Sequence, residues 1–163
     1  MTDNLEKDIT PLGLYFGFFT KHYISILSNF LEHLPIDRFF YPLYLIGKNS
    51  GKITQKDLTE ILNSDKVTIN RIVDFLLEND VIFKEVNPED KRSYNLKITK
   101  SAEKYIEEIE QAITKTDELF LGTIKNKENF NEVICNLYTG LKDKNIDDIS
   151  FIYEKRKKTK SDE

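Results

Sequence analysis

The stretch from Ile69 to Leu76 constrains the fold most, because its apolar residues recur at helical spacing. Positions i, i+3, i+4 and i+7 are Ile69, Ile72, Val73 and Leu76. That spacing predicts an α-helix with one continuous apolar face, which a globular protein buries. The opposite face is expected to carry Val67, Arg71, Asp74 and Glu78, with Asn70 at its flank. Taken alone, this pattern also fits an ordinary helix with a solvated polar face.

Capping residues predict where this helix and the one before it begin. Ser64 is the expected N-cap of the later helix, with Asp65 at the positive end of the helix dipole. The earlier helix begins at Thr54, and Asp57 three residues on makes a close match to a capping box. Its inner stripe is Leu58, Ile61 and Leu62. Asn63 tolerates the left-handed conformation that a tight turn needs, so this helix is expected to end there.

The residues after Asp80, where the later helix is expected to end, predict a β-hairpin. Two β-prone runs, residues 81–83 and the alternating apolar residues of 94–98, flank the turn-forming sequence Asn-Pro-Glu-Asp-Lys-Arg. The tip carries Lys91 and Arg92, and turns are often charged merely because they are exposed. We expect Asp90 to hold Arg92 in place through a charge-assisted hydrogen bond.

Two helices, a turn between them and a hairpin form a winged helix-turn-helix, an arrangement that reads duplex DNA. Asn and Arg side chains make bidentate contacts with adenine and guanine, and Asn70 and Arg71 are placed for this role. Val67 either meets a thymine methyl or folds back under the preceding helix, and we favour the second. An arginine on the wing suits the negative potential of a narrow minor groove. Because Asp74 and Glu78 repel phosphate, only the first two turns of the recognition helix are expected in the groove.

In this order and spacing, Ile53–Thr99 resembles the winged helix-turn-helix of the MarR family of bacterial transcriptional regulators. The resembling pieces are ITQKDLTEIL, SDKVTINRIVDFL and NPEDKRSYNLKIT. The resemblance implies an obligate dimer that binds a pseudo-palindromic operator in double-stranded DNA, and in many members a response to small phenolic or other anionic ligands, or to oxidants. Two positions depart from the pattern: Asp80 stands where a glycine commonly closes the helix, and Val67 where a small polar residue is common.

The expected DNA contacts come from the start of the earlier helix, the first two turns of the recognition helix and the tip of the wing. They are Thr54, Gln55, Lys66, Val67, Thr68, Asn70, Arg71, Lys91 and Arg92, with Asp90 as wing support.

The flanking segments predict long helices that pair two copies of the chain. One helix is expected from Thr10 or Pro11 to about His33, and others from Thr99 to about Leu121 and from Lys127 or Asn129 onward. Their apolar surface is broader than one chain of this size can cover, so we expect a homodimer. A further helix is expected from about residue 37 to 48, with a proline at position 42 that either begins it or kinks it.

The expected fold is therefore mainly α with a small β-hairpin wing, a winged helix-turn-helix with N- and C-terminal dimerisation helices. The parts are a disordered lead (1–9), an N-terminal dimerisation helix (10–35), the DNA-binding unit (36–99), C-terminal dimerisation helices (100–153) and a charged tail (154–163). Residues 145–153 are expected to add a short turn or helix.

The charge of the chain opposes DNA binding. The formal net charge is −4, and Lys155–Lys160 supplies five of the basic residues. From Lys52 to Lys100 there are nine basic and nine acidic residues, so the winged unit is neutral. Binding through counterion release normally uses a basic surface, so non-specific binding is expected to be weak. The alternative function is a winged-helix protein-interaction or adaptor module that does not bind DNA.

No residue constellation for catalysis, a metal or a cofactor is found in the sequence, so an enzyme is not expected. Cys135 is expected to be a buried, inert thiol, with a redox switch as the alternative. A pocket for a small-molecule effector is expected among aromatic residues, which alternatively form core and dimer interface. They are Tyr15, Phe19, His22, Tyr23, Phe39 and Tyr44.

The sequence predicts a cytoplasmic protein that does not enter a membrane. The start MTDNLEKDIT is acidic and polar, unlike a secretory signal. The apolar stretch Leu12–Leu34 is interrupted by charged and polar residues, so it does not read as a transmembrane helix. A single cysteine excludes an internal disulfide.

Overall fold

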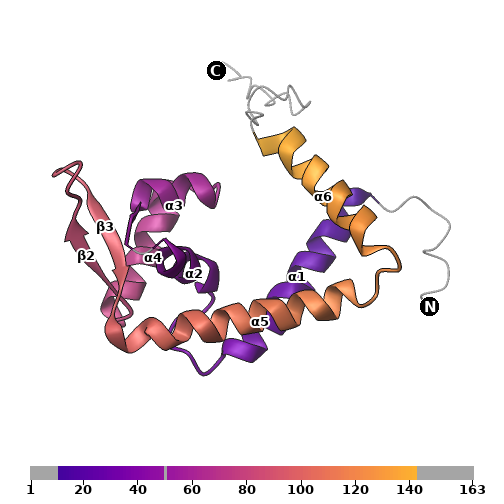
Figure 1. Cartoon of the computed structure of the whole chain (residues 1–163), viewed down its shortest axis with the longest axis horizontal. Helices are drawn as coiled ribbons and strands as arrows, with labels where there is room; N and C mark the ends of the chain where they lie inside the picture. The colour runs from indigo at the N-terminus through magenta and orange to yellow at the C-terminus, as the bar shows by residue number, and fades with distance from the viewer. Residues whose placement is uncertain (1–10, 50, 143–163) are drawn as a thin grey trace, which may run out of the picture. The chain divides into compact units, whose positions relative to one another are not determined.

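The computed structural model describes residues 11–49 and 51–142. In chain order the elements are α1 (Leu12–Leu31), α2 (Phe40–Lys48), β1 (Ile53–Thr54), α3 (Gln55–Ile61), α4 (Lys66–Glu78), β2 (Ile82–Val86), β3 (Tyr94–Ile98), a 3₁₀ turn η1 (Lys100–Ala102), α5 (Glu103–Leu121) and α6 (Lys127–Lys142) (Figure 1). The predicted fold class is confirmed. The chain divides into two compact units between Phe120 and Leu121. The expected lead 1–9, helix 145–153 and tail 154–163 lie outside the described residues.

The strands form a three-stranded antiparallel sheet in the order β1-β3-β2. Ile82 lies opposite Ile98 and Val86 opposite Tyr94, which confirms the predicted hairpin. The sequence predicted only these two strands. The third strand, β1, places Ile53 opposite Leu96. A strand of two residues is too short to show an alternating pattern, and this one runs directly into a helix.

One hydrophobic core joins the winged helix-turn-helix to helices on either side of it. The recognition helix α4 buries the four residues of its predicted apolar face. The second half of α1 contributes Leu27 and Leu31, and α5 contributes Ile109, all at most 1% exposed. The buried face of α4 and residues of both flanking helices of the first unit therefore belong to one core.

The recognition helix begins one residue later than predicted. Its N-cap is Asp65, whose carboxylate accepts a 2.8 Å hydrogen bond from the Thr68 backbone N–H. Ser64, the predicted cap, instead closes α3: its N–H donates to Thr59 O at 3.1 Å, and Asn63 lies in the left-handed region with φ of 45°. This is a Schellman closure, which takes up the Ser64 backbone before α4 starts.

The recognition helix ends in the same way. Asp80 has φ of 54°, and the Val81 N–H donates to Leu76 O at 3.0 Å. Asp80 thus occupies the position for which the resemblance suggested glycine, as predicted. The helix expected from Thr99 begins with the turn η1, of which Thr99 is the N-cap residue but makes no side-chain cap hydrogen bond. Its hydroxyl donates to Asp80 O at 2.8 Å instead, tying the segment before α5 to the end of α4.

The first two helices differ from prediction at their starts. Pro11 is the N-cap of α1 and not its first residue, and Thr10 lies outside the described residues. Helix α2 begins at Phe40, three residues after Asp37, which adopts a left-handed φ of 47°. Pro42 is the third residue of α2, where the helix has no carbonyl partner for an N–H, so it stands at the start and not at a kink.

Helix α6 buries none of its residues in the chain. Cys135 on this helix is exposed, which contradicts the predicted buried thiol. The apolar neighbours Val133, Ile134 and Leu137 are exposed as well, so a single chain does not cover the thiol.

Candidate nucleic-acid interface

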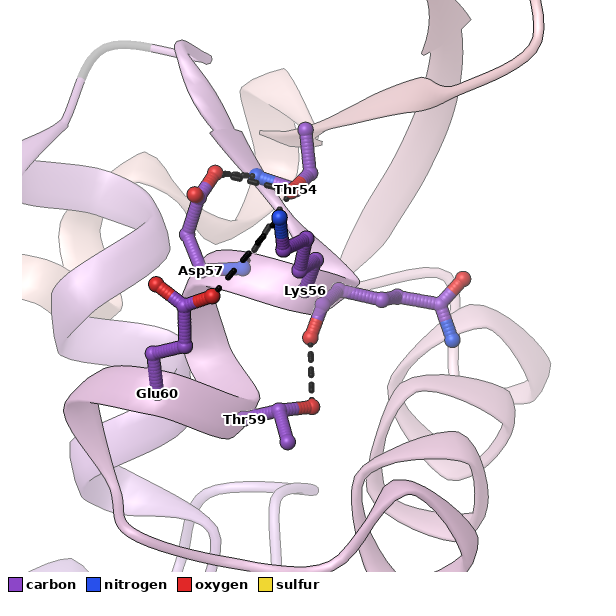
Figure 2. Close-up of polar contacts among 6 residues, drawn as sticks. Thr54, Lys56, Asp57, Thr59 and Glu60 are labelled. Atoms are coloured by element: carbon purple, nitrogen blue, oxygen red, sulfur yellow. Dashed lines mark hydrogen bonds and ion pairs between the residues drawn. The ribbon is translucent and has the colours of Figure 1, made fainter.

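The N-terminus of α3 is held by the predicted capping box. The Thr54 backbone N–H donates to Asp57 Oδ2 at 2.8 Å, and the Asp57 N–H donates to Thr54 Oγ1 at 3.2 Å (Figure 2). The Thr59 hydroxyl donates to the Gln55 carbonyl oxygen at 2.8 Å, one turn into the same helix. The backbone N–H and the hydroxyl of Thr54 are both hydrogen-bonded within the protein. Thr54 therefore fixes the start of α3, where Gln55 lies.

The outer face of α4 is open to solvent. Val67 is 60% exposed, so our preferred interpretation, that it folds back beneath α3, is wrong. The neighbouring Lys66 and Arg71 are also exposed. The reason is the helical spacing, which places Val67 opposite the buried face centred on Ile69 and Leu76.

Thr68 is occupied by the cap of its own helix. Its hydroxyl donates to Asp65 Oδ2 at 2.6 Å, and its backbone N–H donates to the same carboxylate. These hydrogen bonds, that of the hydroxyl first, lower the pKa of Asp65 below its usual value. Thr68 thus positions the first turn of α4.

Asn70 is paired across the helix-turn-helix. Gln55 Nε2 on α3 donates a 3.0 Å hydrogen bond to Asn70 Oδ1 on α4, and both residues are partly exposed. Sequence reasoning missed this contact, since the residues lie 15 positions apart and no periodicity links them. The structure therefore brings two of the predicted DNA-binding residues together as a pair.

Side-chain caps fix the tip of the wing. Asp90 Oδ1 accepts a 3.0 Å hydrogen bond from the Arg92 backbone N–H, and Asn87 Oδ1 accepts one from the Glu89 N–H. The predicted charge-assisted hydrogen bond between Asp90 and Arg92 therefore forms, at the Arg92 backbone; the ion pairs among the described residues do not include one to the guanidinium. The carboxylate reaches the nearer donor, the backbone two residues on, in a turn that this spacing favours.

Lys91 and Arg92 are exposed in the hairpin loop, beyond the last strand pair, Val86 and Tyr94. Figure 1 shows this loop at the free end of β2 and β3. Closer to the core, Lys97 pairs with Glu85 at 2.6 Å, which neutralises one cation of the hairpin. Lys91 and Arg92 are therefore available to bind an external anion.

The six aromatic residues predicted to line a pocket contact different partners. Tyr15 and Phe19 stack with ring centroids 6.3 Å apart on the exposed side of α1. Tyr23 donates a 2.6 Å hydrogen bond to Asp117. Phe39 packs on Phe75 of α4. The remaining contacts are those of His22, whose ring lies 3.9 Å from that of Phe18, and of Tyr44, which lies beneath Lys48 Nζ.

The described residues hold neither a metal cluster nor a membrane-spanning helix. No group of three His, Cys, Asp or Glu side chains among them lies close enough to bind a metal ion. None of the described helices is long and apolar enough to cross a membrane.

Comparison with known proteins connects this site to a family. Residues 43–94, from α2 to the start of β3, match the profile of the MarR family. The multiple antibiotic resistance protein MarR of Salmonella typhimurium is 30% identical over 98 residues, which are 60% of this chain and 68% of that protein. The chain belongs to the MarR family. As a MarR-family protein it is a transcriptional regulator with a DNA-binding winged helix.

Other relatives of this MarR-family chain are more distant. A putative transcriptional regulatory protein for the hcr operon of Thauera aromatica is 29% identical over 86 residues, 53% of this chain and 51% of that protein. A putative MarR family regulator from Listeria monocytogenes, solved in complex with 26mer DNA, superposes with a TM-score of 0.73 at 20% identity, covering 83% of this chain and 91% of that one. A MarR protein from Peptoclostridium difficile gives 0.74 at 19% identity, with 84% and 91% covered. These two structures show the fold.

Proposed function

We propose that this MarR-family protein is a homodimeric repressor that binds a pseudo-palindromic operator in double-stranded DNA in the cytoplasm. The observation that carries the proposal is the open first half of α4. Lys66, Val67 and Arg71 project from a helix whose other face is locked in the core. A rigid helix with a free cationic end meets the need of major-groove recognition, in which the N-terminal residues contact base edges. The expected DNA-contact and domain assignments belong to this proposal.

The wing supplies the second contact of the proposal. Arg92 stands on a loop whose backbone is fixed by Asp90 and Asn87, so its guanidinium is free to enter a minor groove without loss of loop order. Lys91 beside it provides a phosphate contact. The carboxylates of Asp74 and Glu78 lie further along α4 and limit the groove contact to its first two turns.

Exposed apolar surface supports the homodimer. In the first unit, α1 exposes large hydrophobic side chains along its first half: Leu12, Leu14, Tyr15, Phe16, Phe18 and Phe19. In the second unit, α6 exposes Phe130, Val133, Ile134, Leu137, Tyr138 and Leu141. Surfaces of this kind require a partner in water, and a second copy of the chain supplies the two-fold symmetry that a pseudo-palindrome needs. A dimer places two recognition helices on successive turns of one DNA face.

We also propose that a small phenolic or other anionic ligand releases the operator, acting through the aromatic residues of α1 and α2. Support comes from His22, whose Nδ1 lies 2.9 Å from Phe18 O. A carbonyl oxygen only accepts, so Nδ1 donates this bond, and Nε2 is left to hydrogen-bond a polar group of the ligand. Phe19 and Tyr15, which stack on each other about one and two turns before His22, offer ring faces to an aromatic ligand.

A footprinting experiment on DNA upstream of the protein's own gene tests the proposal. We expect protection of an inverted repeat whose half-sites lie about one helical turn apart. A stoichiometry of two chains per protected site is expected. A chain that leaves this DNA unprotected, yet is a stable dimer, would favour the adaptor function, for which the net charge of −4 is the supporting observation.

A further inference from the structure

We infer that Tyr94, together with Lys84 and Val86, binds the sugar-phosphate backbone of the operator on a part of the hairpin that the core leaves uncovered. The inference rests on the proposed function, since it adds a backbone contact to that DNA interface. The Tyr94 hydroxyl donates a hydrogen bond to a phosphate oxygen, and the Lys84 ammonium neutralises the phosphate charge. The Tyr94 ring and Val86 pack on the deoxyribose.

The register of the hairpin places these three side chains on one face of the sheet. Leu96 belongs to the core that the sheet shares with α3 and α4. Lys84 lies opposite Leu96, and Val86 lies opposite Tyr94. Directly opposite residues, and alternate residues along one strand, project to the same face of a sheet. The three side chains therefore project on the side of the sheet against which α3 and α4 pack (Figure 1).

The core ends before it reaches these three residues. On this face Ile82 is 2% exposed and Leu96 is fully buried, whereas Val86 is 51% and Tyr94 is 50% exposed. Lys84 is exposed as well. Lys84, Val86 and Tyr94 thus form an uncovered patch between the core and the wing loop, which we call the inner patch.

The chemistry of the inner patch fits a sugar-phosphate backbone. On the opposite face of the hairpin, Lys97 is neutralised by Glu85 at 2.6 Å. The ion pairs found among the described residues do not include Lys84, and no partner within that part of the chain is found for the Tyr94 hydroxyl. The patch therefore offers an ammonium, a phenol donor and apolar surface, without a carboxylate. Lysine and tyrosine side chains both donate to phosphate oxygens in protein–DNA interfaces.

Tyr94 also lies between the two regions proposed to contact DNA. The wing loop with Arg92 comes two residues before it in the chain. Asn95, the next residue, lies opposite Thr54 at the start of α3, and α3 packs on the recognition helix. A DNA strand that runs from the major groove at α4 to the minor groove at the wing crosses the surface between them. The inner patch is part of that surface.

Two substitutions on the inner patch test the inference by different readouts. Tyr94→Phe removes only a hydroxyl, so we expect operator affinity to fall by roughly tenfold, equally for all sequences, with an unchanged dependence on salt. Lys84→Gln removes a cation, so the slope of log affinity against log salt should become shallower by about 1. Fluorescence anisotropy with the full chain, over a range of salt concentrations, measures both effects.

Three matched variants serve as controls. Tyr15→Phe removes an exposed hydroxyl on α1, and Lys104→Gln removes an exposed cation on α5. Phe83→Leu changes an exposed ring on the opposite face of the same hairpin. All three are expected to keep the affinity and the salt dependence of wild type.

A scan of the DNA backbone separates contact from a structural role. Each operator duplex carries one uncharged methylphosphonate in place of a phosphate, and its affinity is measured for wild type, Tyr94→Phe and Lys84→Gln. At the phosphate bound by the inner patch, the modification should weaken wild type and have less effect on either variant, because the contact is already lost. A substitution that merely disturbed the hairpin would lower affinity by the same factor at every phosphate.

The outcomes distinguish this inference from the function beneath it. If wild type binds no DNA, the proposed function fails, and the inference with it. If wild type binds its operator but Tyr94→Phe binds equally well, the inference alone is wrong. It is also wrong if Phe83→Leu loses as much affinity as Tyr94→Phe, or if both inner-patch variants respond to every methylphosphonate as wild type does.

Discussion

The hydroxyl of Tyr23 on α1 donates a 2.6 Å hydrogen bond to Asp117 Oδ1 on α5. Tyr41 of α2 interacts with Tyr23 and adds to the shift of its pKa, and the Phe120 ring packs on that of Tyr23 with centroids 5.2 Å apart. Burial, and next the bond to Asp117, raise the pKa of Tyr23 well above its usual range. The phenol therefore stays protonated and links three helices of the first unit.

We predict that Tyr23→Phe destabilises the protein by about 1–3 kcal/mol, because it leaves the Asp117 carboxylate without this partner in a partly buried site. Urea unfolding followed by circular dichroism measures the change. Tyr15→Phe is the matched control, since the exposed Tyr15 should give a change within about 0.5 kcal/mol. Equal effects of the two substitutions would rule out a specific role for the Tyr23 hydroxyl.

Asp65 predicts how the protein responds to acid. Hydrogen bonds from Thr68 lower the pKa of Asp65 in the folded chain below its ordinary value of 3.8. A depressed pKa contributes stability that is present above the unfolded value and lost as the pH falls through the folded value. We expect Asp65→Ala to lower the melting temperature near neutral pH, and the difference from wild type to shrink below about pH 4.

Asp65→Asn keeps a capping oxygen but does not titrate in this range, so its melting temperature should respond less to acid than that of wild type. A wild-type advantage over Asp65→Ala that persists unchanged at low pH would contradict the assigned cap.

The wing makes a prediction about Asp90. Because Asp90 Oδ1 accepts from the Arg92 backbone N–H, Asp90→Asn retains the acceptor and should bind operator DNA nearly as well as wild type. Asp90→Ala loses it and should weaken binding by about 1 kcal/mol through a disordered loop. Gel-shift titrations of the two variants measure the difference. Comparable losses in both would instead indicate that the charge of Asp90 matters, as in a pair with the guanidinium.

Val67 makes a prediction that separates stability from binding. At 60% exposure it packs little, so Val67→Ala should change the free energy of unfolding by less than about 0.5 kcal/mol. DNA affinity should fall if the side chain meets a thymine methyl in the groove. Unfolding and DNA-binding titrations on one protein preparation give both numbers. A large loss of stability would instead indicate that the Val67 side chain packs beneath α3.

Local sequence patterns predicted the parts of the fold that depend on residues close together in the chain. The apolar face around Ile69 and the capping box of Thr54 and Asp57 are both encoded within a few positions, and both were predicted. The choice of Asp65 over Ser64 as N-cap was not, because it depends on the Schellman closure of α3 having already used the Ser64 backbone.

Contacts between residues far apart in the chain could not be predicted from the sequence. Strand β1 exists only because β3 offers Leu96 opposite Ile53, and the Gln55–Asn70 bond needs α3 packed on α4. The predicted residues of the DNA site are mostly exposed on α4 and on the wing loop, yet their individual roles changed. Thr54 and Thr68 take part in the N-terminal caps of α3 and α4, and Asp90 accepts a backbone hydrogen bond in the turn of the wing loop.

The central claim is that the open first half of α4 binds DNA. Its most direct test is the affinity of wild type, Arg71→Ala and Arg38→Ala for the duplex upstream of the gene, measured by fluorescence anisotropy over a range of salt concentrations. Arg38 is an exposed arginine outside the site, so its variant controls for the lost charge. We predict salt-dependent wild-type binding, a loss of about 1–3 kcal/mol for Arg71→Ala and little change for Arg38→Ala. Equal losses in both variants, or no binding by wild type, would contradict the claim.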